Sequence, residues 1–249
     1  MRFSCIIPAY NEWPRIEKVL ETVLASPELE EIVVVNDGST DNTREIIDRY
    51  THPKLHKIHL ENNGGKAKAI LEWVKHSTWA YIVMIDSDLL HLTPEHIAML
   101  MKPIQEEETD VTLSIRENSL PIYRFLWTDF VSGERVLPRN IFDDAYSLTT
   151  WPGFGLEVKL NRKIIEHWYS VQNIFLPWVI TPRKSVKYGL IRGTIADWKM
   201  LSEVFSVISF REFFSQLWYF SRFHSWHHSK KESSRIFSSD KTRDRDRIG

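Results

Sequence analysis

Cysteine is almost absent from this sequence, because Cys5 is the only one among 249 residues. A single cysteine excludes a disulfide bond within the chain and fits a reducing compartment. Cys5 lies in an apolar run that is typical of a core strand, so we interpret it as a small buried hydrophobic residue and not as a reactive thiol. We therefore expect a cytoplasmic protein.

Long apolar runs are missing as well. No stretch of about 18 uncharged apolar residues occurs, so we expect no membrane-spanning helix. The first apolar run begins at Phe3, which leaves no room for the charged and apolar regions of a signal peptide. Neither sign of charge is in excess: the formal net charge is -1, which argues against a general nucleic-acid-binding surface.

A chain of 249 residues is long enough to bury a core as one domain. Short apolar runs alternate with helical patterns in the first half, which predicts an α/β fold with a mostly parallel sheet flanked by helices. The predicted strands are Phe3–Ile7, Ile32–Val35, Leu55–Leu60, Tyr81–Ile85 and Val111–Ser114. Helical spacing is found at Ile16–Val23, Ile46–Tyr50 and Ile97–Ile104, and a further helix is expected from about Leu156. Residues from about 120 to 140 show an irregular pattern.

Two carboxylates stand directly after the fourth predicted strand, in Asp86-Ser87-Asp88. Ligands of open α/β sheets bind beyond the carboxyl ends of the strands, so this position favours a site. Paired carboxylates supply the hard oxygen ligands that suit Mg²⁺ or Mn²⁺, and such an ion stabilises charge on a departing diphosphate. The motif alone is equally compatible with a solvated turn.

A second acid, Asp37, follows the second predicted strand, and its carboxylate can accept hydrogen bonds from a base or a ribose. Helix capping explains the nearby Asp41 but not Asp37. Lys66, after two glycines, is placed to meet a phosphate. The stretch lacks the Gly-x-x-x-x-Gly-Lys-Ser/Thr spacing of a P-loop, which excludes a P-loop ATPase. No glycine-rich loop occurs near the N-terminus, which argues against nucleotidyl transfer.

Four ordered stretches together resemble the inverting family 2 glycosyltransferases with the GT-A fold. They are Ile7-Pro8-Ala9-Tyr10-Asn11-Glu12, Val35-Asn36-Asp37-Gly38-Ser39-Thr40-Asp41, Asn62-Asn63-Gly64-Gly65-Lys66 and Asp86-Ser87-Asp88. The resemblance covers roughly the first 120 residues. It implies a nucleotide-sugar pocket lined by Pro8, Tyr10, Glu12, Asp37, Lys66 and Ser87, with Asp86 on the nucleotide sugar and Asp88, together with Asp86, on the metal.

The second half resembles the dolichol-phosphate or polyprenyl-phosphate mannose synthase branch of that family. By this resemblance, Arg116 and Arg135 would bind an acceptor phosphate, although an exposed surface arginine is an equally good interpretation of each. Glu157 stands where many family members carry a Glu-Asp pair that contains the general base, but the aspartate is missing here. A phosphate acceptor is already anionic and needs no such base. Arg183, Lys184 and Lys187 are further candidates for the diphosphate.

The C-terminal part begins with helical spacing at 197–226, where aromatic residues mix with arginines and histidines. Such a face fits the headgroup region of a bilayer, and it fits equally a helix that packs on its own domain or on a partner in a homodimer. Lys230 and Lys231 favour an anionic surface. The charged, Ser-rich segment 229–249 is expected to be a disordered tail.

We therefore expect one catalytic domain at 1–228, made of a nucleotide-sugar half at 1–120, an acceptor half at 121–196 and an amphipathic aromatic helix region at 197–228. The predicted activity is transfer of a sugar from a UDP- or GDP-sugar to a polyprenyl phosphate at the cytoplasmic face of a membrane. Two alternatives remain open. One is a soluble transferase for a small phosphorylated acceptor such as a glycerate, and the other is a non-catalytic protein that binds sugar nucleotides.

Overall fold

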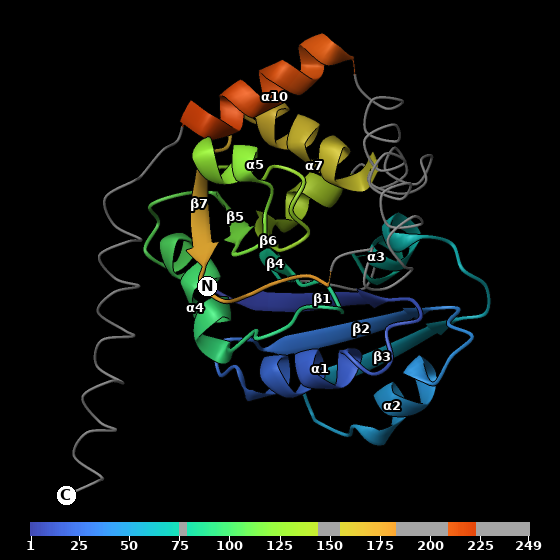
Figure 1. The fold of residues 1–249 in the computed structure, drawn as a ribbon. Helices are drawn as coiled ribbons and strands as arrows, with labels where there is room; N and C mark the ends of the chain where they lie inside the picture. The colour runs from blue at the N-terminus through green and yellow to red at the C-terminus, as the bar shows by residue number, and fades with distance from the viewer. Residues whose placement is uncertain (75–78, 144–154, 183–208, 223–249) are drawn as a thin grey trace, which may run out of the picture.

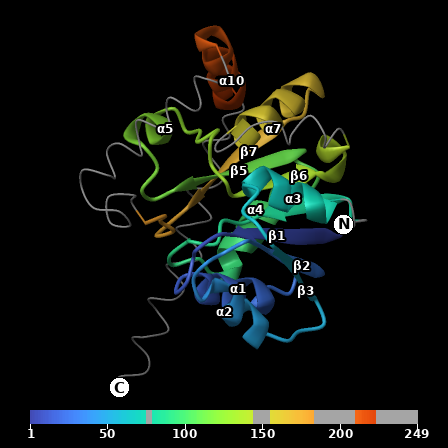
Figure 2. The same ribbon diagram turned by 90° about the vertical axis from the view of Figure 1, so that its right-hand side faces the viewer.

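The structure is a computed structural model that describes residues 1–74, 79–143, 155–182 and 209–222 (Figures 1 and 2). Seven strands form one sheet in the order β3-β2-β1-β4-β6-β5-β7. They are β1 (Phe3–Ala9), β2 (Glu31–Asp37), β3 (Leu55–Leu60), β4 (Tyr81–Met84), β5 (Val111–Arg116), β6 (Arg135–Pro138) and β7 (Val171–Leu176). Strand β6 runs antiparallel to β4 and β5, and the other neighbouring pairs are parallel. The predicted mostly parallel α/β sheet is thereby confirmed.

Helices cover both faces of the sheet (Figure 1). One face carries α1 (Ile16–Ala25), α2 (Thr43–Arg49) and α4 (Pro94–Gln105). The opposite face carries α3 (Lys66–Val74), η1 (Arg139–Phe142), α7 (Gly155–Glu166) and α10 (Phe210–Arg222), with α5 (Pro121–Phe125) beside α10.

Side chains of β1 alternate between the two cores that these layers enclose. Cys5 and Ile7 pack with the layer of α1, α2 and α4, whereas Ile6 packs with the layer of α3 and α7. This alternation follows from the two-residue period of a strand, and helices on both sides of the sheet bury both faces of β1. Cys5 is fully buried, and burial raises the pKa of its thiol, as expected for a structural cysteine.

The second half contains more regular structure than the sequence pattern predicted. The stretch 120–140, interpreted as irregular, contains α5 and β6, and neither β7 nor α3 was predicted. Strand β6 is only four residues long and begins with an arginine, so it shows no apolar run. Strand β7 carries two polar residues at its centre, and one of them, Asn173, is buried and donates to the carbonyl oxygen of Phe220 at 3.1 Å. Because the polar side chain of Asn173 is buried and hydrogen-bonded in the core, β7 does not show the apolar run that predicts a strand.

Helix α10 confirms the predicted helical spacing for 210–222. The remainder of the predicted segment, 197–208 and 223–226, lies outside the described residues, as does the expected tail. One face of α10 packs on the domain through Phe213 and Phe220, whose rings lie 5.3 and 6.5 Å from the ring of Phe130. Phe130 also contacts Tyr123 of α5 at 5.7 Å, so a single buried ring joins the two helices.

No helix of the described ranges combines the length and the apolar character needed to cross a bilayer.

Phe130→Ala should destabilise the domain by about 3–5 kcal/mol, because it removes the buried ring on which α5 and α10 both pack. Urea-induced unfolding of the full chain measures this loss. Trp168→Ala, at a ring that is 76% exposed, is the matched control and should change stability by less than about 0.5 kcal/mol. Equal effects of the two substitutions would show that Phe130 does not anchor these helices.

Candidate functional site

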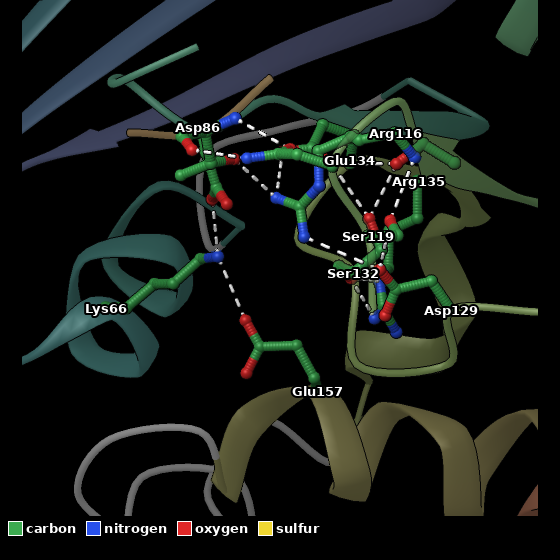
Figure 3. Close-up of polar contacts among 12 residues, drawn as sticks. Lys66, Asp86, Arg116, Ser119, Asp129, Ser132, Glu134, Arg135 and Glu157 are labelled. Carbon is green, nitrogen blue, oxygen red and sulfur yellow. Dashed lines mark hydrogen bonds and ion pairs between the residues drawn. The ribbon is translucent and has the colours of Figure 1, made fainter. Parts of the chain in front are cut away.

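Polar side chains from four parts of the fold lie at the carboxyl edge of the parallel strands, and Figure 3 shows three of them, Lys66, Asp86 and Arg116. Asp37 ends β2, Asp86 follows β4, and Arg116 ends β5, while Lys66 begins α3. Parallel strands deliver their carboxyl ends to the same edge, so residues far apart in sequence converge there. The structure thus brings together the main residues that the sequence predicted for the donor side.

Asp37 fixes the glycine loop that precedes α3. Its carboxylate accepts hydrogen bonds from the backbone N–H groups of Gly64 and Gly65, at 2.8 and 2.7 Å. Gly38, next in sequence, has a φ of 68°, and a Cβ there would lie 2.6 Å from the backbone nitrogen of Asn63. Glycine is therefore required at this close approach. The sequence predicted that Asp37 contacts a base or a ribose. In this structure both of its carboxylate oxygens bind the glycine loop that positions Lys66.

The Lys66 ammonium lies between two carboxylates. Its Nζ donates to Oδ1 of Asp86 at 2.6 Å and to Oε1 of Glu157 at 2.9 Å. Burial alone would lower the pKa of Lys66, but the two carboxylates outweigh it and raise the pKa. Burial likewise would raise the pKa of Asp86, and Lys66 more than compensates, so the pKa of that carboxyl is lowered. Lys66 thus stays protonated and Asp86 stays ionised at neutral pH.

The remaining residues of the predicted nucleotide pocket lie at the end of β1, in the loop that follows it and in the loop after β4. Ser87 is buried, Asp88 and Pro8 are half-buried, and Tyr10 is exposed. Glu12 accepts two hydrogen bonds from Arg15, at 2.8 and 3.0 Å.

The loops after β1 and β2 are joined to each other. The backbone N–H of Thr40 donates to Oδ1 of Asn11 at 2.8 Å, and the backbone N–H of Asn11 donates to the hydroxyl of Ser39 at 3.0 Å. These two hydrogen bonds hold the loops after β1 and β2 together next to Asp37.

Asp86 and Asp88 offer the oxygen donors that a divalent cation prefers. Within the described ranges no group of three or more His, Cys, Asp or Glu side chains is arranged to enclose a metal ion. Two carboxylates at an open edge instead suit Mg²⁺ or Mn²⁺, which keep several ligand positions for phosphate oxygens and water. The donor set therefore fits a metal ion that is shared between protein and ligand.

Behind Asp86 lies a buried polar network that the sequence analysis did not predict (Figure 3). Glu134 is fully buried and accepts hydrogen bonds from the hydroxyls of Ser114 and Ser132, at 2.7 and 2.8 Å. Burial raises the pKa of Glu134, although the charge of Arg116 opposes this shift. Asp129, also buried, accepts a hydrogen bond from Ser119 at 2.7 Å.

Arg116 is held by this network. Its Nη1 donates to Glu134 at 3.3 Å and to the hydroxyl of Thr181 at 2.8 Å, and its Nη2 lies 3.6 Å from Asp129. Burial would lower the pKa of the guanidinium, but Glu134 and Asp129 outweigh it and the pKa is raised. The side chain is 16% exposed, so part of it can still meet a ligand.

Arg135, predicted to bind an acceptor phosphate, is placed differently. Its side chain is fully buried, and its guanidinium donates to the carbonyl oxygens of Ser132 and Phe130 and to Oδ1 of Asn161 in α7. In this structure the buried guanidinium contacts protein oxygens and does not reach the surface, so the acceptor-binding role that the resemblance implied for Arg135 stays a prediction. Arg135 ties the loop before β6 to α7.

Gly133 allows this loop to approach Asp86. A Cβ at Gly133 would lie 2.2 Å from Oδ2 of Asp86 and 2.6 Å from its Cγ. The sequence signal for this close approach is the glycine beside an acid in Ser132-Gly133-Glu134-Arg135. Arg183, Lys184 and Lys187 lie outside the described residues.

Gly133→Ala should reduce the predicted sugar transfer on the order of a hundredfold, because the added methyl group displaces the Asp86 carboxylate by a distance that catalysis does not tolerate. Initial rates at saturating donor and metal measure the loss. Thermal unfolding serves as the control, since the change should act on Asp86 more than on the fold. An unchanged rate would contradict the requirement for this close approach.

Comparisons with known proteins are consistent with this geometry. The family described as glycosyl transferase family 2 matches residues 4–156. An uncharacterized protein of Methanocaldococcus jannaschii is 35% identical over 206 residues, which cover 67% of this chain and 86% of that protein. A dolichyl-phosphate beta-glucosyltransferase of Trichomonas vaginalis is 39% identical over 94 residues, which cover 33% of this chain and 28% of that protein.

A solved structure shows the same fold. It is the glucosyl-3-phosphoglycerate synthase of Mycobacterium tuberculosis in complex with Mn²⁺, uridine-diphosphate and glucosyl-3-phosphoglycerate, with a TM-score of 0.63. The two proteins share 20% sequence identity over 83% of this chain and 79% of that one. At this identity the likeness establishes the fold and leaves substrates open. The family match spans more than half of the 249 residues, so the chain belongs to glycosyl transferase family 2 and is a glycosyltransferase with a GT-A fold.

Proposed function

We propose that this glycosyltransferase moves a sugar from a UDP- or GDP-sugar to a phosphate group of its acceptor, and that the acceptor is a polyprenyl phosphate. One observation carries the proposal: the Lys66, Asp86 and Glu157 cluster and Arg116, which ends β5, lie at the same carboxyl edge of the sheet. A diphosphate-binding group and a second anion-binding group thus share one edge of the sheet. We also propose that residues 1–120 form a nucleotide-sugar half and residues 121–196 an acceptor half.

On the donor side, the loop fixed by Asp37 presents Lys66 to the diphosphate. Asp86 and Asp88 would hold Mg²⁺ or Mn²⁺, and the bound ion would stabilise the negative charge left on the nucleotide diphosphate. The structures of the Mycobacterium tuberculosis synthase that contain Mn²⁺ or Mg²⁺ with uridine-diphosphate support a divalent metal in this fold. Pro8, Tyr10, Glu12 and Ser87 would line the nucleotide around this centre.

On the acceptor side, the state of Glu157 favours a phosphate nucleophile. Its Oε1 accepts the hydrogen bond from Lys66, and the side chain is only 2% exposed. A carboxylate held this way is poorly placed to remove a proton from a hydroxyl acceptor. A phosphate oxygen is already ionised near neutral pH and can attack the anomeric carbon directly, so Glu157 serves to hold Lys66. Displacement in line with the departing diphosphate inverts the anomeric centre.

Helix α10 supports a lipid acceptor over a small one. Phe210, Phe214 and Trp218 are 67%, 62% and 63% exposed and recur every four residues along one face, beside the exposed Arg211. An aromatic stripe with a basic neighbour suits the headgroup region of an anionic membrane. We propose that it brings the enzyme to the cytoplasmic face, where a polyprenyl phosphate presents its reactive group. The dolichyl-phosphate beta-glucosyltransferase among the relatives supports this acceptor class.

A small phosphorylated acceptor, such as a glycerate, is the second candidate. It is favoured by the fold shared with the glucosyl-3-phosphoglycerate synthase, which was solved with phosphoglyceric acid. A non-catalytic protein that binds sugar nucleotides is the least supported alternative, because Asp37, Asp86 and Asp88 are all present. A homodimer that covers the α10 stripe is a further arrangement that the lipid experiment below distinguishes.

Asp88→Ala should lower metal-dependent sugar transfer by at least about a hundredfold, because a divalent ion supplies several kcal/mol of charge stabilisation. Transfer is measured across a titration of Mn²⁺. Asp48→Ala, an exposed aspartate of α2 that contacts His59, is the matched control and should retain activity. Metal-dependent turnover that persists in Asp88→Ala would show that Asp88 does not hold the ion.

The double substitution Phe214→Glu with Trp218→Glu should reduce the fraction of protein bound to anionic vesicles by at least about tenfold, since each exposed aromatic side chain contributes about 1.5–3 kcal/mol on burial. Flotation with phosphatidylglycerol vesicles measures the binding. Trp168→Glu, at another exposed tryptophan, is the control and should bind like the parent protein. Absence of vesicle binding by the parent protein would favour the small acceptor, and a variant that instead loses a dimer in light scattering would assign the stripe to a second copy.

A further inference from the structure

Arg116 uses the two sides of its guanidinium group unequally. Both hydrogens of Nη1 are engaged, one by Glu134 and one by Thr181. The opposite side, formed by Nε and Nη2, makes no hydrogen bond within the part of the chain that the structure describes: Nε is buried without a partner, and Nη2 is 3.6 Å from Asp129. This distance permits attraction between charges but exceeds that of a hydrogen bond.

The Nε and Nη2 side is the one on which an arginine binds a carboxylate or a phosphate with two parallel hydrogen bonds. In this structure Nε is enclosed by the protein and Asp129 faces Nη2, so Arg116 can meet a ligand only through the 16% of its side chain that is exposed. Asp129 lies near that side, and its Oδ1 also lacks a hydrogen-bond partner in the described residues. The carboxylate of Asp129 therefore offsets the charge of Arg116 without accepting a hydrogen bond from Nη2.

Glu134 cannot touch a substrate itself, because it is fully buried. It is fixed from two directions: the hydroxyls of Ser114 and Ser132 donate to Oε2, and the backbone N–H of Ser114 donates to its carbonyl oxygen at 3.0 Å. Its other oxygen, Oε1, accepts from Arg116. Glu134, which directly precedes β6, thus connects the paired strands β5 and β6 to the guanidinium of Arg116 (Figure 3).

We propose that Glu134 is a positioning residue for the acceptor: together with Thr181 it fixes Nη1 of Arg116 and so orients the exposed part of this side chain toward the phosphate group of the acceptor. This inference rests on the proposed function, in which Arg116 binds that phosphate. The ligand that it predicts is a phosphomonoester or inorganic phosphate, bound by a pre-oriented guanidinium. Orientation by a buried acid would reduce the side-chain entropy that a free arginine loses on binding.

The test compares Arg116→Ala, Glu134→Ala and Glu134→Gln in steady-state transfer, with inorganic phosphate as a competitive probe of the acceptor site. Glu134→Ala should raise the acceptor KM and weaken inhibition by phosphate about tenfold, as expected for one hydrogen bond to a charged group. The donor KM should change less than about twofold. Glu134→Gln keeps an oxygen that can accept from Nη1 and should stay within about threefold of the parent protein. Asp143→Asn, an exposed acid paired with Arg139, is the control.

The outcomes separate the inference from the function on which it rests. If Arg116→Ala leaves the acceptor KM unchanged, the proposed role of Arg116 is wrong. If Arg116→Ala raises the acceptor KM and Glu134→Ala leaves it unchanged, Arg116 binds the acceptor but Glu134 does not position it. Should Glu134→Ala fail to fold, Ser132→Ala replaces it, because it removes one hydroxyl from Glu134 and should raise the acceptor KM about threefold. An unchanged KM in Ser132→Ala would then overturn the inference.

Discussion

The ion pair of Lys66 with Asp86 and Glu157 is the contact on which the arrangement of this site depends. It joins three elements, because Lys66 begins α3, Asp86 follows β4 and Glu157 lies in the first turn of α7. Removing the ammonium would leave two largely buried carboxylates facing each other, and breaking such a buried pair costs about 3–5 kcal/mol. Exposed ion pairs contribute about 1 kcal/mol or less, so they cannot substitute for it.

The rest of the site is arranged around this centre in two layers. On one side, Asp37 holds the glycine loop that aims Lys66, and Gly38 permits the loop to pass close to β2. On the other side, the loop before β6 packs on Asp86 through Gly133 and is held to α7 by the buried Arg135. Elements before and after residue 120 therefore share the buried polar contacts of this centre.

Much of the donor side could be predicted from the sequence, because its residues stand in loops directly after apolar runs. Asp37, Lys66 and Asp86 were named from that pattern, and the structure places all three at the same edge. The acceptor side could not be predicted equally well. Its strands β6 and β7 are short or carry buried polar residues, and the acids Asp129 and Glu134 act from inside the core. Hydrophobic periodicity cannot separate a buried hydrogen-bonded polar side chain from a solvated one. The resemblance implied a ligand for Arg135, whose partners in this structure are protein oxygens.

The central claim is that an ionised phosphate of the acceptor, and not a hydroxyl, attacks the donor sugar. The most direct measurement supplies a short polyprenyl phosphate and the matching polyprenol, each with a panel of UDP- and GDP-sugars and Mn²⁺, and identifies the products by mass spectrometry. The account predicts a sugar phosphodiester from the phosphate and no product from the alcohol. Efficient transfer to the alcohol, or to an unphosphorylated sugar added in the same panel, would contradict it.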